Sequence, residues 1–352
     1  MMKSVQKWFI GCVLGIIVLF LFEIGRDFFQ EEELEIRNSI HNLAKETFPG
    51  AAQKVHAQYG LNPYVIGPSE NKSHGESARP LVILIHGLDE PGRVWINLAP
   101  ALAEKGFSVY LMSYANDQPV TVSSRFFFDT LKNYPFKNNK GIVLVGHSMG
   151  GLVSREMLTA PEIGYDQAKK SGQVPDVMRL IMVGTPNHGS ELARFRFFME
   201  IRDQIQNLFE KDTHWLQGLL DGAGEAGIDL TPGSGFLTRL NSRPHPVGIE
   251  YQIIAGVVSP WSDQDVPSLI HQLDQVLPKQ TQPAVIVLDK ALTAMANTIG
   301  DGLVTLDSAM LEGIPLTQVR GNHLTMIRNL TTKSHRVPPA VPRILEILET
   351  RD

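Results

Sequence analysis

The sequence predicts an α/β fold, in which a mostly parallel sheet carries helices on both faces. Short apolar runs rich in Val, Ile and Leu alternate with segments of helical spacing from Leu81 onward. The first run, Leu81–Ile85, is apolar at every position, which is typical of a strand covered on both faces. Strands that alternate with helices indicate parallel neighbours joined by helical crossovers.

The expected elements follow one another in regular order. Apolar β-rich runs predict strands, and apolar residues three and four positions apart predict helices between them. After residue 189 the alternation stops, and the next strand is predicted only at 251–257. The predicted strands are 81–85, 107–112, 142–145, 180–183, 251–257 and 316–319, and the predicted helices are 94–105, 123–133 and 150–159.

The amino-terminal segment indicates export or membrane attachment. Lys3 and Lys7 precede an apolar run, Trp8–Phe22, and Glu31–Glu33 follow it, which favours an amino end inside and a body outside. The run is shorter than the roughly 20 residues of a spanning helix. Residues 1–25 are therefore either a retained anchor or a cleaved signal segment. Both alternatives place the folded body outside the cytoplasm.

The rest of the chain divides by composition. Residues 26–80 combine an amphipathic helix with a loop or linker over 49–80, and residues 81–335 form the α/β domain. Residues 190–246 predict a helical cap over the sheet edge, although an ordinary packed insertion has the same pattern. Residues 263–298 form a helical insertion without an assigned role. Residues 336–352 predict a carboxyl-terminal helix that packs on the domain.

Charge and cysteine content exclude several classes of protein. The formal net charge is -5 and the pI is about 6.1, so the chain lacks the basic character of a nucleic-acid-binding protein. The single cysteine, Cys12, excludes an intrachain disulfide and leaves no cysteine cluster for structural zinc. We expect no metal and no other cofactor. The oligomeric state stays open.

The segment Gly146-His147-Ser148-Met149-Gly150 carries the strongest functional signal. A buried strand runs directly into it and a helix follows, as a nucleophile elbow requires. Such a turn leaves no room for side chains at Gly146 and Gly150. It lifts the hydroxyl of Ser148 above the sheet, close to a helix amino terminus. We therefore expect Ser148 to be a nucleophile.

A serine that attacks an acyl group also needs donors for the oxyanion. One is expected to be the backbone N–H of Met149, the residue after the nucleophile. The second is expected to be the N–H of Leu88, because His86-Gly87-Leu88 follows the first predicted strand of the domain. His86 and Gly87 support this loop, with no proton transfer assigned to the histidine.

The acid and the base should follow the serine in the chain. Asp301 stands in a Gly-Asp-Gly turn, and His323 stands in a turn after the last predicted strand. We expect His323 to take the proton of Ser148 and Asp301 to orient the imidazole. Asp307 is an alternative acid. Other histidines are weaker candidates for the base, namely His188, His214, His271 and His335.

These motifs, in this order, resemble those of bacterial lipases and esterases of the α/β-hydrolase superfamily. The stretch Gly184–Ser190 also resembles one in GPI inositol-deacylases. The resemblance implies an α/β-hydrolase fold with a helical cap insertion and the triad Ser148, Asp301 and His323. It further implies that Thr185–Ser190 shapes the pocket floor. The structural calcium of several such lipases is not expected, since the chain offers no suitable acidic cluster.

The predicted activity is hydrolysis of a carboxylic ester through an acyl-serine intermediate. Apolar cap residues favour a hydrophobic ester or lipid substrate, and the amino-terminal segment would bring the enzyme to a membrane. Two alternatives remain, an acyltransferase or deacylase on a membrane glycolipid and a non-catalytic envelope scaffold. The cap residues are Phe195, Phe197, Phe198, Leu208, Phe209, Trp215 and Leu219.

Overall fold

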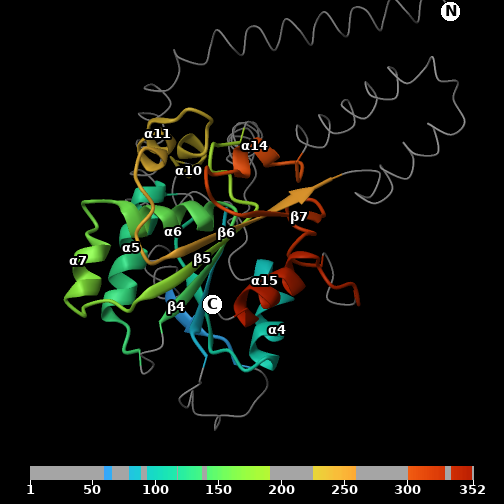
Figure 1. Ribbon diagram of the computed structural model, residues 1–352, viewed down its shortest axis with the longest axis horizontal. Coiled ribbons are helices and arrows are strands. Elements are labelled where there is room, and N and C mark those ends of the chain that lie inside the picture. Colours follow the sequence, from blue (N-terminus) through green and yellow to red (C-terminus); the bar gives the residue numbers. More distant parts are fainter. Residues whose placement is uncertain are drawn as a thin grey trace, which may run out of the picture.

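The computed structural model of the protein describes residues 59–65, 79–88, 93–116, 118–136, 141–190, 225–258, 300–329 and 334–350. Within these ranges, seven strands form one sheet in the order β1-β3-β2-β4-β5-β6-β7 (Figure 1). Strand β1 (Gly60–Pro63) is antiparallel to β3, and every other pair is parallel. The predicted α/β class with a mostly parallel sheet is confirmed.

The central strands are buried from end to end. All residues of β2 and β4 are buried, because helices cover both faces of the sheet. Leu81 of β2 pairs with Ile142 of β4, and Ile85 pairs with Gly146, so the two strands end at the same level. The parallel strands are β2 (Leu81–Ile85), β3 (Val109–Ser113), β4 (Ile142–His147), β5 (Val177–Val183), β6 (Glu250–Val257) and β7 (Leu316–Arg320).

Alternate side chains of each strand enter two separate cores. Ile83 joins the core beneath α5 (Val120–Asn133), α6 (Met149–Thr159) and α7 (Tyr165–Lys170). Its neighbour Leu84 joins the core on the opposite face of the sheet. The helices of this second face are η1 (Arg93–Trp95), α4 (Leu98–Glu104) and α15 (Ala340–Glu349).

Strand β1 and helix α7 are among the elements that depart from the sequence-based expectation. Strand β1 lies within residues 49–80, where a loop or linker was expected. It contributes a single buried side chain, Leu61, and ends in Pro63, so it lacks the apolar pattern that marks a strand. Helix α7 is only six residues long and was not predicted, because so short a segment shows little periodicity.

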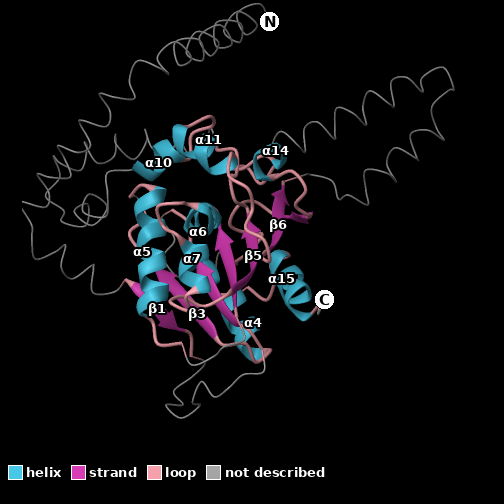
Figure 2. Ribbon diagram, turned by 60° about the vertical axis from the view of Figure 1, so that its left-hand side comes forward, coloured by secondary structure: helices cyan, strands magenta, loops and turns pink. Residues whose placement is uncertain are grey.

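Several predicted segments lie outside the described residues. These are the amino-terminal segment with its apolar run, the aromatic cap residues between 191 and 224, and the insertion at 263–298. Three helices of the surrounding sequence are described. Figure 2 shows α10 (Glu225–Asp229), α11 (Gly235–Asn241) and α14 (Leu306–Ala309) gathered beyond the carboxyl ends of the strands.

In the portion of the chain that the structure describes, no helix has the length and apolar character needed to cross a membrane.

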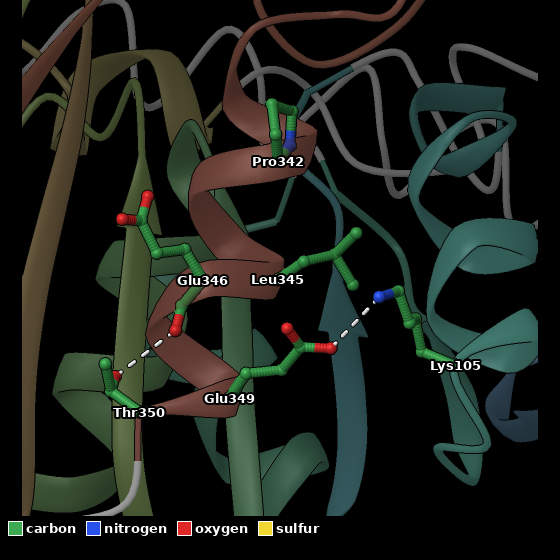
Figure 3. Close-up of a pocket in the computed structure, with 6 residues that line it drawn as sticks. All are labelled: Lys105, Pro342, Leu345, Glu346, Glu349 and Thr350. Atoms are coloured by element: carbon green, nitrogen blue, oxygen red, sulfur yellow. Dashed lines mark hydrogen bonds and ion pairs between the residues drawn. The ribbon is translucent and has the colours of Figure 1, made fainter.

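A surface groove lies between α4 and α15, near the amino ends of the strands (Figure 3). Lys105, the residue that follows α4, forms an ion pair of 3.2 Å with Glu349 in the last turn of α15. Both helices run back from the carboxyl ends of the strands, so their last turns lie at the amino ends. The groove is therefore far from the carboxyl ends of the strands, where Ser148 lies.

Candidate active site

The predicted site residues follow the carboxyl ends of neighbouring strands. His86 follows β2, Ser148 follows β4, and Gly184 follows β5. Asp301 lies in the long connection between β6 and β7, and His323 lies in the turn after β7. Because these strands are parallel, their ends meet at one edge of the sheet, where an open α/β fold binds its ligands.

Ser148 occupies a sharp turn between β4 and α6. Its φ of 53° is the single positive φ of a non-glycine residue within the described ranges. Such a conformation costs about 1–3 kcal/mol, so the surrounding structure must enforce it. The Ser148 N–H donates to Val183 of β5 over 2.9 Å, and the Ser148 carbonyl accepts from Gly151 over 3.1 Å. Helix α6 begins at the next residue, Met149.

Close packing of the turn explains the two glycines of the motif. A Cβ on Gly146 would lie 2.5 Å from the nitrogen of Gly151, within the turn itself. A Cβ on Gly150 would lie 2.1 Å from the carbonyl oxygen of Ile85, at the end of β2. Backbone atoms cannot move aside as a side chain can, so only glycine is compatible with either position.

Asp301 and His323 form a buried pair. The distance from Asp301 Oδ2 to His323 Nδ1 is 2.7 Å, and the two residues are 2% and 7% exposed. The other carboxylate oxygen, Oδ1, accepts the N–H groups of Leu303 and Val304 at 2.9 and 2.8 Å. Each oxygen of the carboxylate therefore has a partner, and the ring of His323 has a fixed orientation.

The backbone also fixes His323 in relation to Asp301 and to the nucleophile turn. The His323 N–H donates to the carbonyl of Asp301 over 2.9 Å. The carbonyl of His323 lies 3.0 Å from Nε2 of His147, the residue before the nucleophile. A Cβ on Gly184 would lie 3.1 Å from Asp301 Oδ2 and 3.3 Å from the ring of His323. Within the described residues, no hydrogen bond joins Ser148 Oγ to this ring.

His147 and His86 are buried and neutral. Burial, reinforced by the nearby His323, lowers the pKa of His147 to about 3. Burial lowers the pKa of His86 to about 4, against a smaller opposing effect of its hydrogen bond to Gly87. Neither ring takes up a second proton near neutral pH, which fits supporting positions beside the nucleophile.

The loop after β2 lies directly against the nucleophile. A Cβ on Gly87 would come within 2.7 Å of Ser148 Cβ and 3.2 Å of its Oγ, so the loop needs glycine here. The ring of His86 stacks on Tyr114 with 4.5 Å between centroids. The Tyr114 hydroxyl donates to the carbonyl of His86 over 2.5 Å. The sequence does not predict this contact of Tyr114, because a tyrosine after a strand is commonly a core residue.

The Gly184–Ser190 loop contacts both α6, the helix after the nucleophile, and the turn that holds Asp301. Thr185 packs against Gly151 at the start of α6. The Ser190 hydroxyl donates to the carbonyl of Leu303, whose N–H in turn donates to Asp301. Asn187 is fully buried and accepts a hydrogen bond of 3.0 Å from Arg155 of α6. Through Ser190 and Leu303, the loop thus helps to fix the position of Asp301.

The alternative site residues lie elsewhere. Asp307 is exposed on α14, and no hydrogen bond to His323 is found for it in the described structure. His188 is exposed, and its Nδ1 lies 3.4 Å from the amide of Asn241. His335 is exposed near α15. His214 and His271 lie outside the described residues.

Comparison with known proteins supports the fold. Residues 113–287 match the model of the PGAP1-like alpha/beta domain family, a range that includes Ser148 and ends before Asp301. The chain has no significant match among curated proteins.

Among solved structures, the mature lipase BlEst2 of Bacillus licheniformis superposes with a TM-score of 0.51 at 19% identity. The alignment covers 82% of this chain and 98% of the lipase. Phospholipase PlaB of Legionella pneumophila superposes with a TM-score of 0.50 at 15% identity, over 78% of this chain and 60% of PlaB. The chain therefore has the α/β-hydrolase fold and, over residues 113–287, resembles the PGAP1-like alpha/beta domain family.

Proposed function

We propose that this protein is a serine hydrolase that cleaves carboxylic esters. The observation that carries the proposal is the buried pair of Asp301 and His323, joined over 2.7 Å beside the strained turn of Ser148. An acyl-transfer serine needs a base, and the base needs a partner that fixes its tautomer. With Nδ1–H donated to Asp301, His323 presents an unprotonated Nε2 for the proton of a nucleophile.

The proposed reaction proceeds in two halves. Ser148 Oγ attacks the carbonyl carbon of the ester while His323 Nε2 takes the hydroxyl proton. The N–H groups of Leu88 and Met149 stabilise the tetrahedral oxyanion. The intermediate collapses to an acyl-serine, and the leaving alkoxide takes the proton from His323. Water then attacks the acyl-serine with the same proton relay, which releases the acid and restores Ser148.

The groups present suit these roles. Met149 is the first residue of α6, and the first N–H groups of a helix have no acceptor within it. The carboxylate of Asp301 accepts two backbone N–H groups besides its contact with the ring, so it is held in place to orient the imidazole. No described residue other than Ser148 combines a strained turn with this neighbourhood.

Sequence features outside the described residues favour an apolar substrate near a membrane. The aromatic and leucine residues of 195–219 would cover the site as a cap, and the apolar run Trp8–Phe22 would hold or export the body. We therefore propose a hydrophobic ester or lipid as the substrate and a location outside the cytoplasm.

Covalent labelling tests the proposal directly. A fluorophosphonate probe should label Ser148, as identified by peptide mapping, and p-nitrophenyl esters of increasing chain length should be hydrolysed. Ser148→Ala should abolish labelling and lower kcat by at least about 10⁴-fold. The matched control is Ser171→Ala, in the exposed end of α7, which should change neither. A folded wild-type protein that neither labels nor hydrolyses any ester would favour a scaffold instead.

A second candidate reaction uses the same intermediate. The Gly184–Ser190 stretch lies within the range that matches the PGAP1-like family, and it resembles that of GPI inositol-deacylases. This favours a test of deacylation or acyl transfer on a glycolipid. Product analysis in the presence of competing alcohols separates the two reactions, because a transferase yields a new ester and a hydrolase yields the free acid.

A further inference from the structure

The segment after β3 contacts the loop that is proposed to hold the oxyanion. Asn116 lies three residues beyond the end of β3, and its side-chain amide donates to the carbonyl of Gly87 over 3.1 Å. Nδ1 of His86 lies 2.8 Å from the same oxygen. The carbonyl of Gly87 therefore has two donors, one from within its own loop and one from a different strand connection.

This carbonyl belongs to the same peptide unit as the N–H of Leu88. A trans peptide is planar, and its C=O and N–H point in opposite directions. Donors that hold the Gly87 oxygen on one side consequently aim the Leu88 N–H to the other side. Gly87 itself lies against Ser148, as the close approach of its position to Ser148 Cβ and Oγ shows. The orientation of this one peptide thus decides whether the Leu88 N–H points toward the oxyanion formed on Ser148.

Because Gly87 has no side chain, its backbone does not by itself fix the orientation of the Gly87–Leu88 peptide. A peptide that follows Gly87 can rotate through conformations that a Cβ would forbid, so the chain alone does not fix it. The preceding carbonyl, that of His86, is held separately by the hydroxyl of Tyr114. Tyr114 and Asn116 come from one short segment, and Ser123 of α5 donates to Ala115 between them over 3.2 Å. This anchors the segment to the nucleophile side of the sheet.

We propose that Asn116 is a positioning residue, which sets the Gly87–Leu88 peptide so that the Leu88 N–H faces the oxyanion formed on Ser148. The inference rests on the proposed ester hydrolysis and extends it to a residue that touches neither substrate nor reacting atoms. Asparagine suits the role, because its amide donates a hydrogen bond without placing a charge beside the developing oxyanion. An aspartate here would repel both the carbonyl and the oxyanion.

The test compares Asn116→Leu, which keeps the approximate size and removes the donor, with the wild-type protein. Rates are expressed per site titrated with the fluorophosphonate. We expect kcat to fall about 10- to 100-fold with KM nearly unchanged, since a misplaced donor loses part of the roughly 10²–10³-fold effect of an oxyanion donor. Affinity for a boronic acid that forms a tetrahedral adduct with serine should fall by a similar factor.

The matched control is Asn62→Ala. The Asn62 amide likewise donates to a backbone carbonyl, that of Gly60, and to Ser113 at the end of β3, but within the described residues it makes no hydrogen bond to His86, Gly87 or Leu88. It should keep the wild-type kcat. A crystal structure of Asn116→Leu supplies a readout that does not depend on activity, and in it the Gly87 carbonyl should have turned from its present direction.

The outcomes separate the two proposals. Wild-type protein without esterase activity and without labelling at Ser148 would overturn the function and, with it, this inference. An active wild type with an unchanged kcat in Asn116→Leu, or an unchanged peptide in its crystal structure, would overturn the inference alone. A lower melting temperature with normal kcat per titrated site would assign Asn116 a merely structural role, which also contradicts it.

Discussion

At the scale of single residues, Asp301 divides its two carboxylate oxygens between two kinds of partner. Oδ1 accepts two backbone N–H groups and Oδ2 lies against His323. This division makes Asp301→Asn an informative variant. The amide oxygen must take the place of Oδ1, because the backbone donors need an acceptor. The amide NH₂ then faces His323 Nδ1 and can only donate to it.

We expect Asp301→Asn to fold and to lose most of its activity. A donor at this position favours the tautomer with hydrogen on Nε2, which cannot accept the proton of Ser148. The expected loss of kcat is about 10³–10⁴-fold, measured with a p-nitrophenyl ester under saturating conditions. Asp307→Asn, on exposed α14, is the control and should retain wild-type kcat. The assignment of the acid fails if Asp307→Asn is the variant that loses activity.

At the scale of elements, the crossing of α6 over the end of β2 sets the position of Ser148. Gly150 of α6 faces the carbonyl of Ile85 at a distance that excludes any side chain. Gly150→Ala should therefore push α6 away from the sheet and lower the free energy of unfolding by about 2 kcal/mol or more. Urea unfolding followed by circular dichroism measures this change.

Gly235→Ala provides the comparison for this substitution. Gly235 begins α11, and a Cβ there would meet only the mobile end of the Arg239 side chain, at 3.2 Å. Alanine at a helical position should stabilise the protein slightly or leave it unchanged. Equal effects of the two substitutions would mean that the contact between α6 and β2 does not determine the close packing.

Elements with a strong pattern could be predicted from the sequence, and those defined by their contacts could not. Leu81–Ile85 is apolar throughout, and the predicted strand agrees with β2 at both ends. β1 was missed because antiparallel pairing with β3 makes it a strand, while its own residues show no alternation. Helix α5 begins at Val120 rather than at the predicted Ser123. The N–H of Val120 donates to Asp229 of α10, a residue far away in the sequence, so the sequence around Val120 does not reveal this start.

The same contrast applies to the site. A strand followed by Gly-x-Ser-x-Gly is a local pattern, so Ser148 and the turn around it could be identified in advance. Asp301 and His323 could be named only by their order and their turns, and their 2.7 Å contact needed the folded sheet. The sequence gives no indication of a role for Asn116, because asparagine is a common turn residue after a strand. Its contact with the carbonyl of Gly87 is visible only in the folded structure.

At the scale of the whole molecule, the two buried histidines couple stability to pH. His86 and His147 have pKa values of about 4 and about 3 in the folded protein, against about 6.5 for an exposed histidine. Between pH 6.5 and 4 the unfolded chain therefore binds protons that the native protein does not. The free energy of unfolding should fall as the pH falls through this window, by up to about 1.4 kcal/mol per pH unit for each histidine.

His147→Gln isolates one of these contributions. A glutamine amide can still donate to the carbonyl of His323, but it does not titrate, and the neighbouring charged groups Asp301 and Arg328 remain. Urea unfolding at pH 7, 6 and 5 should show a shallower loss of stability in the variant, by roughly 1 kcal/mol per pH unit below pH 6. Parallel curves for the two proteins would mean that His147 accepts a proton in the native state.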